Sequence, residues 1–174
     1  MTNKPKHIGT AAETAVVGWA AANGFNQAER RALHGSHDQG DILLCLGVII
    51  EVKAGKKAET AADALIDMWL DQTETERLNA QADIGVLVTK RAGYGTSRVG
   101  DWWAWLTIGA FTALSSGGQW AGPIILDNGT QAAGFDCYDQ PARLRLKDLA
   151  MLLRLNGWGN PITTQERNQQ PCTD

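Results

Sequence analysis

The chain lacks the features that would tie it to a membrane, a disulfide framework or a metal–thiolate site. No stretch approaches the ~20 apolar residues of a membrane-spanning helix, and the opening MTNKPKHIGT contains no apolar signal core. The three cysteines, Cys45, Cys137 and Cys172, are odd in number, far apart and without metal-site spacing. We therefore expect a cytoplasmic protein with free thiols and no membrane association.

The chain also lacks an excess of either charge, an internal repeat and any evident linker. Its net charge is −3, which argues against nucleic-acid binding over the whole surface but leaves room for local basic patches. A length of 174 residues suits one domain with its own core. We expect this domain to span residues 1–159 and residues 160–174 to form a disordered tail.

The local patterns predict a mixed α/β (α+β) fold, with a central sheet flanked by helices. Helices are predicted over residues 10–23, 58–80 and 141–157. Strands are predicted over residues 25–33, 41–46, 48–53, 84–90 and 133–138. Residues 101–117 read as a strand that continues into a helix. The glycine-rich loop 91–100 lacks the Gly-Lys-Ser/Thr ending of a P-loop, so no nucleotide cofactor is expected.

The stretch GDILLCLGVIIEVKAG (40–55) places charges directly against the ends of an apolar hairpin. Glu51 and Lys53 share one face of their strand. Asp41 would lie opposite Glu51, with Cβ atoms ~4.5–5.5 Å apart, if the hairpin turned about Leu46 with an odd-numbered loop. A two-residue turn at Leu46–Gly47 would send the two acids to opposite faces unless a bulge restored the register. Facing carboxylates repel, and Mg²⁺ would remove the conflict, so the pattern predicts a metal site.

A third acid, Glu13, is the only charged residue between Ala11 and Ala22. A lone carboxylate in so apolar a helix is typical of a buried or site-lining residue. A solvent-facing glutamate near a helix N-terminus is the alternative, since the helix dipole stabilises negative charge there. The sequence leaves both interpretations open.

The order GTAAE (9–13), a loop, GD (40–41), nine residues and EVK (51–53) resembles the PD-(D/E)XK nuclease superfamily, and within it the archaeal and phage-type Holliday junction resolvases. The resemblance covers roughly residues 7–90 and departs at Gly40, where many members have proline. It implies a restriction-endonuclease-like core and an Mg²⁺-dependent endodeoxyribonuclease, with Mn²⁺ as a substitute. It also implies a homodimer acting on branched DNA in recombination and repair, in the host cytoplasm if the chain is phage-encoded.

The resemblance assigns roles to individual residues. Asp41 and Glu51 would bind Mg²⁺ with the Val52 carbonyl, and Glu13 would complete the acidic cluster directly or through water. Lys53 would position or help to deprotonate the attacking water and offset charge on the scissile phosphate. The alternative is a surface hairpin with ordinary solvated charges at its ends.

Weaker signals surround this set. Gln72 shares a helical stripe with Trp69 and is an accessory candidate, or simply an exposed polar residue. Ser36 could touch a phosphate or be an ordinary turn serine. Trp103 and Trp105 share a face, where base stacking is possible but core or dimer packing is favoured. Candidate DNA-binding residues, taken from local basic groups, are Arg30, Arg31, Lys56, Lys57, Lys90, Arg91 and Arg98.

Three functions follow in order of preference. The first is a structure-selective resolvase of four-way junctions. The second is a restriction-like or repair nuclease on linear, flapped or mismatched DNA. The third is a non-catalytic DNA-binding or assembly subunit that keeps the nuclease fold; the presence of both acids and the lysine argues against it.

Overall fold

The computed structural model describes residues 4–31, 38–117 and 139–168. Their sheet has six strands in the order β1-β2-β3-β4-β5-β6. The β3–β4 pair is parallel and the other four neighbouring pairs are antiparallel. The strands are β1 (Glu29–Arg30), β2 (Ile42–Cys45), β3 (Val48–Lys53), β4 (Ile84–Thr89), β5 (Trp103–Thr107) and β6 (Pro141–Arg145). The mixed sheet with flanking helices confirms the predicted α+β class.

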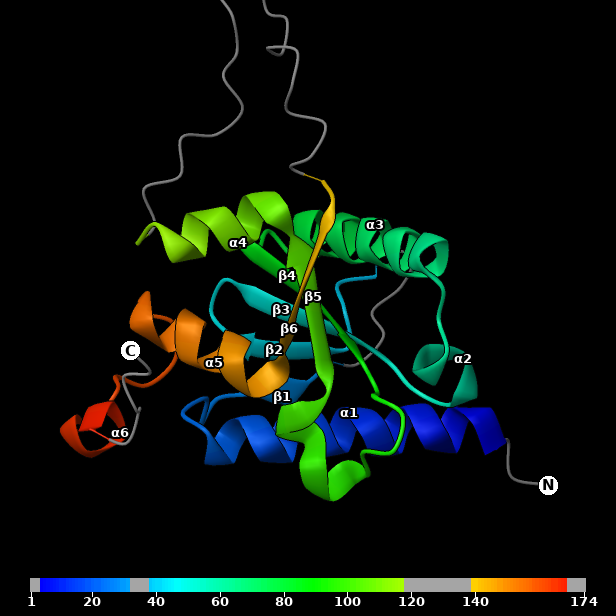
Figure 1. The fold of residues 1–174 in the computed structure, drawn as a ribbon, viewed down its shortest axis with the longest axis horizontal. Helices are drawn as coiled ribbons and strands as arrows, with labels where there is room; N and C mark the ends of the chain where they lie inside the picture. Colours follow the sequence, from blue (N-terminus) through cyan, green and yellow to red (C-terminus); the bar gives the residue numbers. More distant parts are fainter. Residues whose placement is uncertain (1–3, 32–37, 118–138, 169–174) are drawn as a thin grey trace, which may run out of the picture.

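Helices cover both faces of the sheet, with α1 below it and α3 above it in the view of Figure 1. The helices are α1 (Lys4–Ala22), α2 (Lys56–Glu59), α3 (Asp63–Asn79), α4 (Ile108–Ser115), α5 (Leu146–Leu155) and α6 (Thr164–Asn168), with a 3₁₀ segment η1 (Thr96–Asp101). No helix among the described residues is long and apolar enough to cross a membrane.

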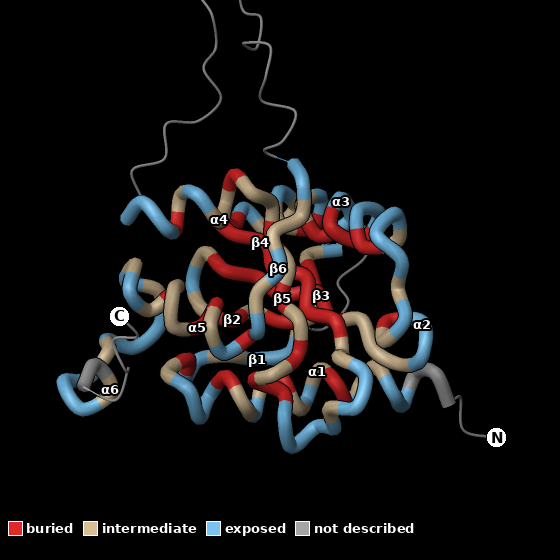
Figure 2. Tube along the Cα trace, viewed as in Figure 1, coloured by how far each residue is buried: buried red, intermediate tan, exposed pale blue. Residues whose placement is uncertain are grey.

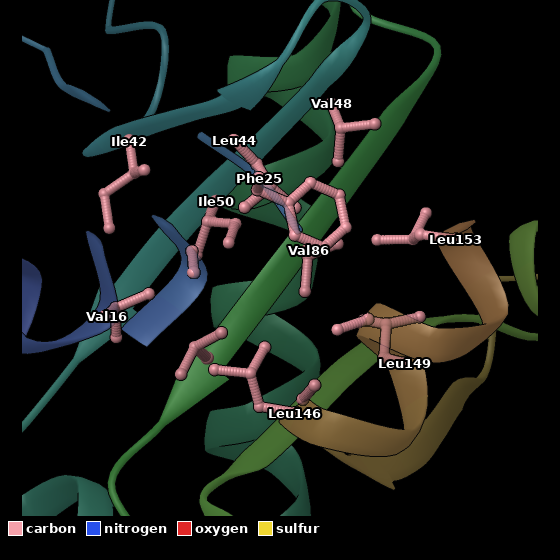
Figure 3. Close-up of a cluster of buried hydrophobic side chains, with 14 of the residues drawn as sticks. Val16, Phe25, Ile42, Leu44, Val48, Ile50, Val86, Leu146, Leu149 and Leu153 are labelled. Carbon is pink, nitrogen blue, oxygen red and sulfur yellow. The ribbon is translucent and has the colours of Figure 1, made fainter. Parts of the chain in front are cut away.

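The alternation of side chains along the strands divides the core into two layers, and Figure 2 shows buried positions concentrated along the central strands. Even-numbered strand residues such as Ile42, Ile50 and Val86 pack against α1 and α5 (Figure 3). Odd-numbered Leu87 packs with Trp69 and other residues of α2 and α3 on the opposite face. Glu51 and Lys53 are odd-numbered, so they project on the α3 face.

A glycine on β4 lets α3 approach the sheet closely. A Cβ built on Gly85 would lie 3.1 Å from the Cβ of Arg77 and 3.2 Å from the carbonyl oxygen of Thr73. Thr73 and Glu76, on the side of α3 that faces the sheet, are both buried. The close approach brings polar residues of α3 onto the sheet beside the charged end of β3.

Several element boundaries differ from the sequence-based predictions. Helix α1 begins at Lys4 rather than Thr10, and the strand predicted over 25–33 is only Glu29–Arg30. The helix predicted over 58–80 is two helices, because Thr60 leaves helical geometry at φ −127°. The N-terminal part of the helix predicted over 141–157 is strand β6, which completes the sheet beside β5. The edge strand predicted over 133–138 lies outside the described residues.

The segment predicted as a disordered tail packs on the domain as far as it is described. Helix α6 occupies Thr164–Asn168. The side chain of Glu166 forms a 2.7 Å ion pair with Arg154 of α5. The Asn160 N–H donates a hydrogen bond to the Gly24 carbonyl at 2.7 Å. These contacts tie residues 160–166 to α5 and to the turn after α1.

Candidate active site

The β2–β3 hairpin places Asp41 opposite Glu51 because a β-bulge offsets its two-residue turn. Ile42 pairs with Ile50 and Leu43 with Ile49, whereas Cys45 pairs with Val48. The register therefore shifts between Leu43 and Cys45, and this bulge compensates for the two-residue turn at Leu46–Gly47. Gly47 adopts φ +83°, which suits glycine in a tight turn. Continuing the pairing of residues 42 and 50 brings residue 41 opposite residue 51 on the α3 face.

Main-chain contacts hold Asp41 in place at the start of β2. Its Oδ2 accepts a 2.9 Å hydrogen bond from the Val52 N–H. Because the N–H and C=O of one strand residue point to the same side, the Val52 carbonyl also faces the Asp41 side. Gly40, just before, has φ +83°. Proline cannot adopt that angle, so proline would not fit this backbone at position 40.

The two carboxyl groups are close enough to perturb each other. Burial and then the charge of Glu51 raise the pKa of Asp41 to about 7, with a smaller contribution from Glu13 and an opposing one from the Val52 N–H. Burial also raises the pKa of Glu51, although the hydrogen bond and charge of Lys53 oppose the rise. The acids therefore face each other, as the metal-site prediction requires.

Lys53 joins this pair to helix α3. Its Nζ lies 2.5 Å from Glu51 Oε1 and 3.5 Å from Gln72 Oε1. Gln72 in turn donates from Nε2 to Glu76 Oε1 at 2.9 Å. The accessory candidate Gln72 therefore does lie beside Lys53, with an exposed side chain.

Glu76 is a component that the sequence-based analysis did not propose. It is 2% exposed, and its Oε2 has no hydrogen-bond partner among the described residues. Burial raises its pKa, helped by Asp38 and opposed by Lys53 and Gln72. Its position four residues after Gln72, on the same helical stripe, was the available signal. Asp41, Glu51, Lys53, Gln72 and Glu76 together form what we call the carboxylate–lysine site.

Glu13 lies at the margin of this site rather than inside it. Its side chain is 15% exposed and forms an ion pair with Arg30 of β1, so it is neither fully buried nor solvent-facing. Its charge still raises the pKa of Asp41. Glu13 can act on the site through that charge, while Arg30 already balances its carboxylate.

Most of the candidate DNA-binding residues already have intramolecular partners. Arg31 donates to the Gln39 carbonyl at 2.9 Å, Lys90 pairs with Glu59 at 2.7 Å, and the Lys57 Nζ lies 5.8 Å from the centre of the Trp69 ring. Lys56 is exposed on α2. Arg91 and Arg98 stack on Tyr94. Ser36 lies outside the described residues.

The donor set suits a hard cation held largely by water and substrate. No group of three or more His, Cys, Asp or Glu side chains in the described parts of the chain is arranged to hold a metal ion. Asp41, Glu51 and the Val52 carbonyl offer two carboxylates and one neutral oxygen. Mg²⁺ keeps several waters and commonly takes only one or two carboxylates. Burial, together with a neighbouring carboxylate, raises the pKa of each acid, and a cation bound here would compensate their negative charge.

Comparisons with protein-family models, curated proteins and solved structures found no match to this chain. The features that point to a function are therefore the geometry of the carboxylate–lysine site and the spacing of its motif in the sequence.

Proposed function

We propose that the chain is a metal-dependent endodeoxyribonuclease with a restriction-endonuclease-like core, and that its substrate is a four-way DNA junction. The observation that carries the proposal is the pair of facing acids, Asp41 and Glu51, with the Lys53 amine 2.5 Å from Glu51. The junction preference depends on the motif resemblance alone. Linear or flapped DNA is therefore the second substrate class to be tested.

The residues divide the work of phosphodiester hydrolysis. Asp41, Glu51 and the Val52 carbonyl would hold Mg²⁺ or Mn²⁺, which supplies Lewis-acid activation and charge compensation at the scissile phosphate. Lys53 would orient the attacking water and stabilise the negative charge that develops on the phosphoryl oxygens. As the water oxygen bonds to phosphorus, it gives up a proton to solvent, the bond to the leaving sugar oxygen breaks, and that oxygen takes up a proton from solvent.

Gln72 and Glu76 support Lys53 from the side of α3. Gln72 accepts from Lys53 and donates to Glu76, so its amide orientation is fixed from both ends. This series of hydrogen bonds limits the positions open to the Lys53 amine. Gln72 and Glu76 are positioning residues in this scheme, since no contact of theirs with the reacting atoms is required.

A cleavage assay on defined DNA tests the proposal. A four-way junction and a linear duplex of the same sequence, each labelled on one strand, are incubated with the protein in Mg²⁺, in Mn²⁺ and in EDTA. We expect cleavage of the junction that requires the metal and that Asp41→Ala and Lys53→Met abolish, while binding to the junction is retained. Asp67→Asn, which alters an exposed acid of α3, is the charge-matched control and should cut normally.

Each outcome decides between the candidates. Normal cleavage by Asp41→Ala would overturn the metal-site mechanism. Equal cleavage of the linear duplex would favour the restriction-like alternative. An absence of cleavage on every DNA in both metals, with DNA binding retained, would favour the non-catalytic subunit.

We further propose that the active form is a homodimer, since symmetric cutting of a junction requires two active sites. Sedimentation of the protein with and without junction DNA tests this. A monomer on the junction that cuts both strands would contradict it.

A further inference from the structure

An alternating stack of arginine and aromatic side chains runs from the loop after β4 onto strands β5 and β6. Each guanidinium carbon lies between 4.0 and 5.3 Å from the centre of a neighbouring ring. Arg91 touches two rings, and so does Arg143. The members, in spatial order, are Arg98, Tyr94, Arg91, Trp103, Arg143 and Trp105, and we call them the Arg–aromatic stack.

The two central arginines of the stack are not neutralised. Neither Arg91 nor Arg143 makes an ion pair with any described residue, whereas Arg98 pairs with Asp101 at 3.2 Å. Arg91 and Arg143 lie 4.2 and 4.5 Å from the centre of the same ring, that of Trp103, so two like charges are held close together. Ring contacts order the guanidinium planes but leave their charge and in-plane N–H donors available. An anionic partner would complete this arrangement.

Trp103 of the stack and the proposed catalytic Lys53 lie in one row of paired residues across the sheet. Lys53 pairs with Thr89, Thr89 with Trp103, and Trp103 with Arg145. Paired residues project from the same face of a sheet, and two strand spacings amount to roughly 10 Å. A DNA strand advances ~3.4 Å per nucleotide. A strand whose phosphate lies at Lys53 would therefore reach Trp103 within about three nucleotides.

We infer that the Arg–aromatic stack binds the sugar–phosphate backbone of the DNA strand that continues from the scissile phosphate. This inference rests on the proposed nuclease function, because it places that strand at Lys53. Tyr94 and Trp103 each contact two arginines, so guanidinium edges rather than ring faces are left to meet the ligand. The contact is therefore to phosphate and carries no base preference.

Salt-dependent DNA binding tests the inference, with Arg143→Gln compared against Arg145→Gln. Both residues are exposed arginines of the edge strand β6. Arg145 pairs with Asp148 at 2.6 Å, which makes it the matched control. Fluorescence anisotropy with a labelled four-way junction in EDTA gives Kd between 50 and 300 mM KCl, without cleavage. We expect Arg143→Gln to weaken binding roughly tenfold and to lower the slope of log K against log salt by about 1.

A third variant separates the stack from simple charge. Trp103→Leu leaves the net charge unchanged but removes the ring shared by Arg91 and Arg143. We expect several-fold weaker binding, because the two guanidiniums lose their fixed orientation. Circular dichroism checks that this variant folds; Arg143→Gln, at an exposed position, provides the test if it does not.

The outcomes distinguish this inference from the proposed function. If wild-type protein cuts DNA and Arg143→Gln binds like Arg145→Gln, the stack inference fails and the nuclease stands. If Arg143→Gln loses affinity but wild type never cuts, the nuclease fails and the DNA-binding surface stands. If Arg143→Gln changes the sedimentation of free protein but not the salt slope, the stack contacts a second copy, and the inference is overturned. An absence of DNA binding by wild type at 50 mM KCl overturns both.

Discussion

Replacing Asp41 with asparagine should make the metal-free protein more stable while destroying its activity. The carboxyl of Asp41 lies beside that of Glu51, and burial together with this neighbour raises its pKa from 3.8 to about 7. In the unfolded chain the pKa returns to its ordinary value. The folded state therefore binds the proton more tightly, so stability is greatest at acidic pH and falls as pH rises from about 4 towards 7. Above pH 7 Asp41 is ionised in the folded protein, and the loss of folding stability that it causes is complete.

The size of the penalty follows from the pKa. At ~1.4 kcal/mol per pKa unit, the rise from 3.8 to about 7 amounts to about 4 kcal/mol at pH 8. Asp41 is half-buried, so solvent screening reduces this value, and we expect Asp41→Asn to raise the free energy of unfolding by about 2–4 kcal/mol. The asparagine oxygen can still accept from the Val52 N–H, which retains that hydrogen bond. For a chain of this size the gain corresponds to a rise in Tm of roughly 4–16 °C.

Urea unfolding measures this directly. In EDTA at pH 8, the free energy of unfolding of Asp41→Asn should exceed that of wild type by about 2–4 kcal/mol. At pH 4.5 the difference should fall to within about 1 kcal/mol. Adding Mg²⁺ at pH 8 should stabilise wild type, by about 2.7 kcal/mol at 100 times its Kd, and leave the variant almost unchanged. The exposed control Asp67→Asn should stay within about 0.5 kcal/mol of wild type throughout. A variant no more stable than wild type at pH 8 in EDTA would refute the electrostatic argument.

Two further predictions concern the scaffold. Gly85→Ala should lower the free energy of unfolding by about 1–3 kcal/mol, because its Cβ would lie 3.1 Å from Arg77 Cβ and force α3 outward; urea unfolding equal to wild type would contradict the close packing. Burial raises the pKa of the Cys45 thiol, so iodoacetamide at pH 8 should modify this cysteine at least tenfold more slowly in the folded protein than in urea. Peptide mass spectrometry follows the reaction, and equal rates in the two states would show that the thiol is accessible.

The sequence was most informative where the site depends on local geometry. Alternation along a strand was enough to put Glu51 and Lys53 on one face. Whether Asp41 lies on the same face depends on the number of residues in the hairpin loop and on any bulge, and the composition of the segment determines neither. The structure restores the register with a bulge between Leu43 and Cys45, one of the two alternatives that the sequence left open.

The sequence was less informative where pairing over a long distance decides the structure. Residues 141–145 were predicted to begin a helix, yet they form β6 because β5 offers them a partner strand. The alternation in Ala-Arg-Leu-Arg was a strand signal that the helical pattern beyond it outweighed. The sequence pattern gives no sign that Arg143 is a binding residue, since its contact with Trp103 exists only when β6 pairs with β5.

The charges of the site give the strongest reason to expect a cationic ligand there. Glu51 interacts with the carboxyl of Asp41 on one strand and with that of Glu76 on α3, and one amine, that of Lys53, lies beside it, while Glu13 is already balanced by Arg30. If all three acids ionise, the set carries two negative charges more than positive ones. Buried carboxylates without compensation destabilise a fold, and neutral residues of similar size could replace them. One divalent cation supplies the missing charge, and the pH dependence of the Asp41→Asn variant tests whether that deficit exists.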